Sequence, residues 1–265
     1  MTSSSTFAPS RGYSAARPAV RQIGIQDLKA ALSRGVDDFL AIPTHVLFVV
    51  LIYPVAGVVI AAATFERDLI PILFPLAAGF ALIGPFAALG LYELSRRREW
   101  GLPAAWTDAY TPLRGRSAKA VLAVGMVLAL IFLAWLCAAM GLYWALYGGV
   151  TEPSLLAFLD DVLTTPRGWL LIVAGNLVGA AFSLLALAVS AVSIPLIIDK
   201  DTDAGTAIET SLALMRENPG TMLAWGAIVA GLLVIGMVSL FVGLAVVLPV
   251  LGHATWHLYR RAVAA

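Results

Sequence analysis

The residues best suited to chemistry in this sequence of 265 residues are its three histidines. His253 and His257 stand four positions apart, which places them on one face of a helix, and His45 opens the first long apolar run. Neutral imidazoles that converge with a carboxylate, such as Glu93 or Asp199, suit zinc, copper or iron. These five residues form the candidate polar pocket, and the three histidines are the candidate ligands of a divalent transition metal.

A second interpretation needs no cofactor. Histidines near the ends of membrane spans often form interfacial hydrogen bonds, in the same belt as tryptophan and tyrosine. The sequence contains no glycine-rich phosphate loop, no Cys-x-x-Cys pair and no His-Glu-x-x-His motif. We therefore expect no catalytic residues and no cofactor, with the metal site of the three histidines as the alternative.

The composition is that of an integral membrane protein. Hydrophobic residues make up 60% of the chain and charged residues 12%, and the mean hydropathy is +0.91. Soluble domains carry about 25% charged residues, so a soluble fold would have too few charges to cover its surface. The net charge of +1 argues against a nucleic-acid partner, because phosphate binding needs a clustered positive excess.

Long apolar runs divide the chain into membrane spans, each needing about 20 residues to cross the hydrocarbon core. The last run, 222–259, would be about 57 Å long as one helix, so we predict a turn near Gly236 that divides it in two. The prediction is an all-α polytopic bundle with six transmembrane helices, at approximately 44–64, 69–94, 119–147, 169–198, 220–237 and 240–260.

The distribution of basic residues predicts the orientation of this bundle. With six spans, 15 of the 17 Lys and Arg residues fall on one side, and basic residues near spans favour the cytoplasm. Both termini are therefore expected to be cytoplasmic. Residues 1–22 are predicted to form a disordered tail, and residues 23–263 a single membrane domain.

An amphipathic helix is predicted before the first span. Its apolar positions recur at spacings of three and four and include Leu28, Leu32, Val36 and Phe39. Arg34 and Asp38 are expected to face water, and the helix should stop at Ile42 because Pro43 follows. Similar patterns at 106–113 and 208–215 predict three repeats of one unit, an interfacial helix followed by two spans.

Several stretches of the sequence resemble a bacterial family of predicted integral membrane proteins, domain of unknown function 2189. They read IGIQDLKAALSRGVDDFLAIPTHVLFVVLIYPVAG, FPLAAGFALIGPFAALGLYELSRRREWG, SIPLIIDKDTDAGTAIETSL and LPVLGHATWHLYRR. The resemblance covers most of residues 21–261. It implies a multi-span protein of the inner membrane of Gram-negative bacteria, and it brings no established activity or catalytic residues.

Three classes of function follow from these features. The preferred one is a non-enzymatic accessory or assembly component of a membrane complex, with membrane lipid and other membrane subunits as partners. The first alternative is a small-solute or lipid permease, in which proline-kinked spans gate a path. The second alternative is a metal- or quinone-binding membrane enzyme that uses the histidines.

Overall fold

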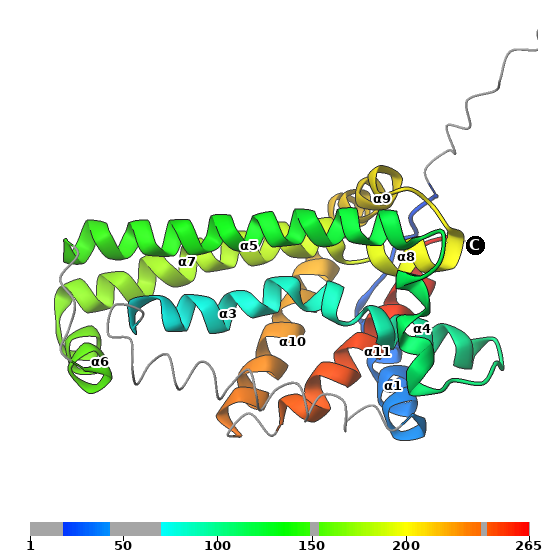
Figure 1. The fold of residues 1–265 in the computed structure, drawn as a ribbon, viewed down its shortest axis with the longest axis horizontal. Helices are drawn as coiled ribbons and strands as arrows, with labels where there is room; N and C mark the ends of the chain where they lie inside the picture. Colours follow the sequence, from blue (N-terminus) through cyan, green and yellow to red (C-terminus); the bar gives the residue numbers. More distant parts are fainter. Residues whose placement is uncertain (1–17, 43–69, 149–153, 240–242, 265) are drawn as a thin grey trace, which may run out of the picture.

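The computed structural model describes residues 18–42, 70–148, 154–239 and 243–264 (Figure 1). In the described residues, the only strand-like pairing is an isolated antiparallel bridge between Val20 and Val263. The fold of these residues is therefore all-helical. Its helices are α1 (Ile25–Ala41), α3 (Ile70–Ala87), α4 (Leu89–Glu99), the 3-10 helix η2 (Trp106–Leu113), α5 (Ala118–Tyr147), α6 (Leu155–Thr164), α7 (Pro166–Ser190), α8 (Ser193–Lys200), α9 (Ala204–Glu217), α10 (Pro219–Val238) and α11 (Leu244–Ala262).

The long helices α3, α5 and α7 lie side by side along the longest dimension of the molecule (Figure 1). Four segments are long and apolar enough to cross a membrane, and two of them combine consecutive helices, α3 with α4 and α7 with α8. The four segments are Phe74–Glu99, Ala118–Tyr147, Pro166–Lys200 and Pro219–Val238.

The six predicted spans are only partly represented among these segments. The first, 44–64, lies outside the described residues. The last, 240–260, corresponds to α11, which is not one of the four candidates, because its second half carries two histidines and two arginines. The predicted threefold repeat likewise involves the undescribed first span.

Two of the predicted spans contain a break close to a proline. α3 ends at Ala87, two residues after Pro85, and α7 ends at Ser190, before Pro195 in α8. Proline lacks the N–H that an α-helix needs and its ring crowds the preceding turn, so helices bend or end near it. The short helices α4 and α8 can thus leave the direction of the long helices.

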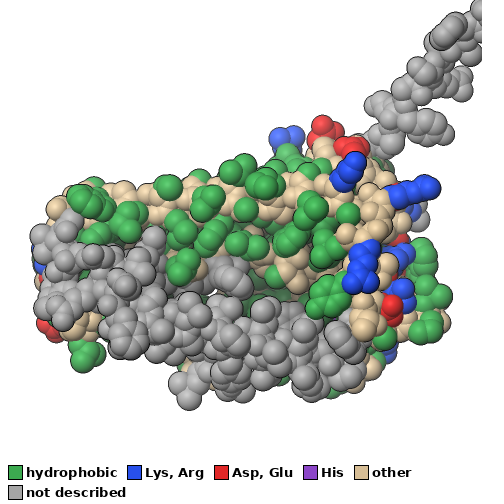
Figure 2. Space-filling view, in the orientation of Figure 1, with side chains coloured by type: hydrophobic (Ala, Val, Ile, Leu, Met, Phe, Trp, Pro, Cys, Tyr) green, Lys and Arg blue, Asp and Glu red, His purple; other side chains and the backbone are tan. Residues whose placement is uncertain are grey.

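Charged side chains gather at the end of the molecule where α4, α8 and α9 lie, whereas apolar side chains cover the long helices (Figure 2). We call this end the polar end. α1 lies along α11 there, and α4 contacts α11, α8 and η2. The polar end therefore contains the short helices that carry the predicted pocket residues.

The N-terminal segment is fastened to the polar end before α1 begins. The backbone N–H of Arg21 donates to the carbonyl of Ala262 at 2.8 Å, and that of Ile23 donates to Asn218 Oδ1, also at 2.8 Å. The Thr221 hydroxyl donates to the carbonyl of Ile23 at 2.9 Å. Contacts with the domain thus begin before residue 22, where the predicted tail was expected to end.

α1 ends where the sequence predicted, but the side chains on its buried face differ in part from those expected. The helix ends at Ala41, before Pro43, and Leu28 is buried while Arg34 is exposed, as expected. However, Val36 is 41% exposed and Asp38 only 3% exposed, so the prediction that Asp38 faces water is wrong. The reason is that α11 offers polar partners. The buried stripe consists of Leu28, Ala31, Gly35 and Asp38.

Candidate functional site

The candidate site forms where α1 crosses α11 at close range. A Cβ atom added to Gly35 would lie 2.7 Å from the Cβ atom of Ala254 and 2.8 Å from the carbonyl oxygen of Val250. Only glycine leaves room for the two backbones to approach this closely. The contact brings Asp38, one turn along α1, against the histidines of α11.

Asp38 is the centre of a hydrogen-bond cluster that joins three helices. Its Oδ2 accepts from the Ser95 hydroxyl of α4 at 2.6 Å and contacts His257 Nε2 of α11 at 2.8 Å. Its Oδ1 accepts from the guanidinium of Arg98, also on α4. We call Asp38, Ser95, Arg98, His253 and His257 the Asp38 cluster.

The electrostatics of the cluster favour an ionised carboxylate. Burial by itself raises the pKa of Asp38, but hydrogen bonds from His257, Ser95 and Arg98 outweigh this effect and lower the pKa to about 2. Asp38 is therefore charged at neutral pH and can only accept hydrogen bonds.

This charge state fixes the proton positions in the rest of the cluster. Ser95 has one hydroxyl proton and gives it to Asp38, so it must act as an acceptor toward His253, whose Nδ1 lies 2.7 Å from the Ser95 oxygen. His253 consequently donates from Nδ1. Its other nitrogen, Nε2, is buried and has no hydrogen-bond partner in the part of the chain that the structure describes. A neutral His253 would thus keep a free electron pair on Nε2 inside the protein.

One face of the cluster borders an open cavity of about 420 Å³. It is lined by Arg34, Asp37, Asp38, Arg98, Glu99 and His257. Asp38 and His257 therefore both border the cavity, whereas His253 is not part of its lining and is fully buried. The hydrogen bonds continue inward from His257 through Asp38 and Ser95 to His253.

The structure brings together two of the five residues of the predicted pocket. His253 contacts Ser95 and His257 contacts Asp38, and these two partners are hydrogen-bonded to each other. The buried Glu93 instead pairs with Arg96 at 2.8 Å and Arg97 at 3.0 Å. His45 lies outside the described residues.

Asp199 serves a separate group of contacts. Its Oδ2 accepts from the Tyr259 hydroxyl at 2.6 Å and from Arg260 at 3.3 Å. Arg260 also pairs with Glu99, which in turn accepts from the indole N–H of Trp256 at 2.8 Å. These contacts fasten α11 to α4 and α8 without involving either histidine.

Sequence reasoning missed Asp38, Ser95 and Arg98 as members of the site. One signal was present, because Gly35 and Asp38 continue the spacing of Leu28 and Ala31 along one face of the helix. A small residue on such a face indicates close helix packing. A charge beside it on the same face indicates a buried polar partner.

The metal interpretation depends on residues that the structure does not bring together. Searching the described ranges gives no group of three or more His, Cys, Asp or Glu side chains that could hold a metal ion. The histidine site predicted from the sequence also needs His45, which lies outside those ranges. It stays a prediction.

Comparisons with known proteins agree with the membrane character of the fold. A family model described as a predicted integral membrane protein, DUF2189, matches residues 73–199. No curated protein and no solved structure matches the chain. The matched range runs from α3 to α8 and includes Ser95 and Arg98 of the Asp38 cluster. It confirms the resemblance noted in the sequence over residues 73–199, which are similar to this family of predicted integral membrane proteins.

Proposed function

We propose that this protein is a non-enzymatic accessory or assembly component of a membrane complex in the bacterial inner membrane. It spans the membrane six times with both termini in the cytoplasm. The polar end and the long helices differ in how their side chains are used, and this difference supports the proposal. Most buried polar groups at the polar end are used in internal hydrogen bonds, whereas the long helices present large apolar side chains outward.

The outward faces of α5 and α7 supply this apolar surface. Large side chains that are more than half exposed include Leu122, Met126, Leu130, Leu133, Trp144, Trp169, Leu170, Val173 and Leu177. Such surfaces in a membrane protein contact lipid or other membrane helices. Contacts of this kind would let the protein join a larger assembly.

The polar cluster supports a structural role more directly than a catalytic one. Ser95 is fully buried and both of its contacts, Asp38 and His253, are members of the same cluster. A catalytic serine must reach its substrate, whereas a serine whose two partners both lie inside a buried network helps to rigidify a fold. We infer that the Asp38 cluster holds α1, α4 and α11 in place.

The proposed topology rests on the basic residues and on the helix order. The positive charges at the polar end favour the cytoplasmic side (Figure 2). Short helices α1, η2 and α9 each precede the regions predicted as pairs of spans. A repeat of an interfacial helix and two spans accommodates this order, with α10 and α11 as the last pair.

The single cysteine of the chain gives a direct test of the proposed role. Cys137 is exposed on α5, so a photoreactive maleimide attached to it would sample what covers that face in native membranes. A matched control moves the cysteine to α7 in a Cys137→Ser and Leu177→Cys double variant. We expect a discrete protein adduct of reproducible mass from at least one position, recovered again when the identified partner is expressed with the protein.

Adducts with lipid alone from both positions would overturn the proposed role and favour the permease alternative, in which these faces meet the bilayer.

One observation keeps the metal-binding alternative testable. Nε2 of His253 is buried without a partner among the described residues, and a neutral imidazole nitrogen of this kind is a metal ligand in other proteins. Metal analysis of the purified protein should give less than one tenth of an equivalent under the main proposal. A stoichiometric metal that is lost in His253→Gln and retained in Asp37→Asn would favour the alternative.

A further inference from the structure

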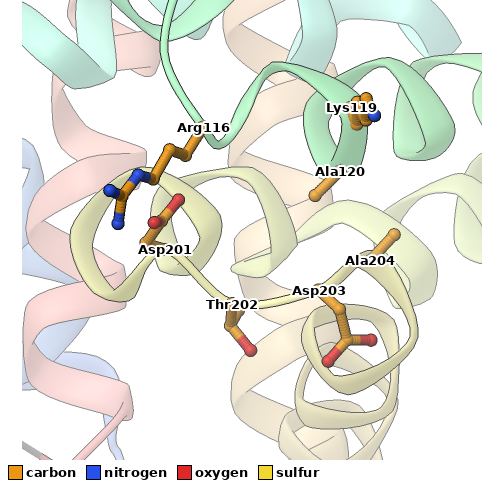
Figure 3. Close-up of a pocket in the computed structure, with 7 residues that line it drawn as sticks. All are labelled: Arg116, Lys119, Ala120, Asp201, Thr202, Asp203 and Ala204. Atoms are coloured by element: carbon orange, nitrogen blue, oxygen red, sulfur yellow. The ribbon is translucent and has the colours of Figure 1, made fainter.

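A second open cavity of about 420 Å³ lies at the polar end, and it shares no lining residue with the cavity beside the Asp38 cluster. It is lined by Arg116, Lys119, Ala120, Asp201, Thr202, Asp203 and Ala204 (Figure 3). These residues come from the start of α5 and from the connection between α8 and α9. The cations are Arg116, just before α5, and Lys119, in its first turn. The carboxylates are Asp201 and Asp203, between α8 and α9.

The two cations of this cavity are available to a ligand. In the ranges that the structure describes, neither Arg116 nor Lys119 has an ion-pair or hydrogen-bond partner. Both side chains are exposed. They differ in this from Arg96 and Arg98 of α4 and from Arg260 of α11, whose guanidinium groups pair with buried carboxylates.

The two carboxylates keep part of their acceptor capacity. Asp201 accepts one hydrogen bond, from the Ser117 hydroxyl at 3.0 Å. Asp203 accepts from the backbone N–H of Thr206 at 3.0 Å and from its hydroxyl at 2.7 Å, and so caps α9. Each carboxylate can accept further bonds, because two carboxylate oxygens offer about four acceptor positions. The cavity therefore presents both signs of charge.

An apolar surface leads away from the cavity along α5. Leu122 and Met126 follow Lys119 at spacings of three and seven, which places all three on one helix face. The exposed side chains continue with Leu130 and Leu133, each more than half exposed. The stretch from Leu122 to Leu133 spans roughly 16 Å, comparable to most of one acyl chain.

We propose that this cavity binds the headgroup of a zwitterionic phospholipid that carries a phosphate and a primary ammonium, as in phosphatidylethanolamine. Arg116 and Lys119 contact the phosphate, and Asp201 with Asp203 accepts from the ammonium. An acyl chain lies along the exposed face of α5. The mixed charges of the cavity select this headgroup over one with a net negative charge. The ammonium donates hydrogen bonds to the two carboxylates, whereas a headgroup without it would leave them facing only negative charge.

The position of the cavity agrees with this ligand. It lies at the start of α5, whose residues Ala118–Tyr147 form a candidate span, so the cations stand at the boundary between water and hydrocarbon. Basic side chains at such boundaries interact with lipid headgroups. A cavity of this volume is within the usual range for small-ligand sites.

Native mass spectrometry of the full-length protein in detergent tests the proposal with three lipids. Phosphatidylethanolamine has both required groups, phosphatidylglycerol lacks the ammonium, and phosphatidylcholine has an ammonium that cannot donate hydrogen bonds. We expect phosphatidylethanolamine to bind about tenfold better than either of the others, the effect of one charge-assisted hydrogen bond. Equal or tighter binding of phosphatidylglycerol would overturn the proposal.

Variants separate a built site from general electrostatic attraction. The double variant Arg116→Ala and Lys119→Ala should lose about tenfold in phosphatidylethanolamine binding. Asp201→Asn should remove the preference over phosphatidylglycerol. Arg114→Ala is the matched control, because Arg114 is an exposed cation outside the cavity lining. If Arg114→Ala weakens binding as much as the double variant, the cavity does not select the lipid and the proposal fails.

Discussion

The polar end and the long helices hold their helices together by different contacts. At the polar end, one ionised carboxylate, Asp38, receives hydrogen bonds from α4 and α11. Among the long helices, the large ring of Trp135 on α5 fits against Gly79 of α3 and Gly179 of α7. The first region depends on matching donors and acceptors, and the second depends on matching volumes.

Because of this difference, the two regions should respond to different substitutions. A change at Asp38 that preserves volume but removes the charge replaces one acceptor oxygen with an NH2 donor, so at least one donor on α4 or α11 loses its acceptor, and a buried unpaired group is costly. In the long helices the same kind of change costs less, because few polar groups are involved there. Changes of volume at the glycines or at Trp135 matter more in that region.

The largest effect is expected from Asp38→Asn. The substitution removes the charge that accepts hydrogen bonds from Arg98, Ser95 and His257, and the loss of hydrogen bonds to a buried charged group costs about 2–3 kcal/mol, reduced by the partial exposure of Arg98. We expect a corresponding fall in the free energy of unfolding, measured by denaturant titration in detergent. Asp37→Asn is the control, since the neighbouring Asp37 is exposed and surface changes stay within about 0.5 kcal/mol. Equal losses in the two variants would show that the cluster contributes nothing specific.

The next effect is expected from Gly35→Ala, which tests the close approach of α1 and α11. The added methyl group would meet Ala254 and the backbone at Val250 at less than 3 Å, so the helices must separate at a cost of about 1–3 kcal/mol. Gly141→Ala on α5 should instead be neutral or stabilise the protein by up to about 1 kcal/mol, because no atom lies within 4 Å of the new group. Destabilisation by both changes to the same extent would contradict the close approach of α1 and α11 at Gly35.

The pH dependence of stability should come partly from Asp38. Its pKa is lowered to about 2 in the folded protein, below the value of about 3.9 in an unfolded chain. The stabilisation is therefore complete above about pH 4 and is lost as the pH falls toward 2. Melting curves of the native protein and Asp38→Asn should converge over this interval. A constant difference between the curves down to pH 2 would show that the charge of Asp38 is not the origin of the stabilisation.

A smaller effect is expected from Trp135→Phe in the long helices. The indole N–H donates to the carbonyl of Pro75 at 2.9 Å, and losing such a bond costs about 1 kcal/mol. Trp144→Phe on the same helix is the control, because Trp144 is 60% exposed. A loss for Trp135→Phe as large as for Asp38→Asn would remove the distinction between the two regions.

Sequence patterns predicted much of the helical framework for simple physical reasons. The proline after Ile42 ends α1, and the length of the run 222–259 requires the division that lies between Val238 and Leu244. The spacing of His253 and His257 predicted their common face, and both contact the Asp38 cluster. These features depend on local sequence or on helix geometry alone.

The composition of the site could not be predicted in the same way. Asp38 is expected to face water when α1 is considered alone, because an isolated carboxylate is costly to bury. Its burial becomes favourable only when Ser95, Arg98 and His257 arrive from two other helices. Glu93 was assigned to the pocket as a carboxylate that could converge with the histidines, but arginines three and four residues further along the same helix pair with it. In both cases the position of the carboxylate depends on the donors that the folded chain places beside it.

Hydrogen bonds that converge on Asp38 hold α1 and α11 together. A double-mutant cycle with Asp38→Asn and His257→Gln tests this most directly, with unfolding free energies measured in detergent at neutral pH. Residues in one hydrogen-bond network couple by about 0.5–3 kcal/mol, and their separation of 2.8 Å places this pair toward the upper part of that range. We predict that the double variant is less destabilised than the sum of the single variants by about 1–3 kcal/mol. Strict additivity would contradict the account.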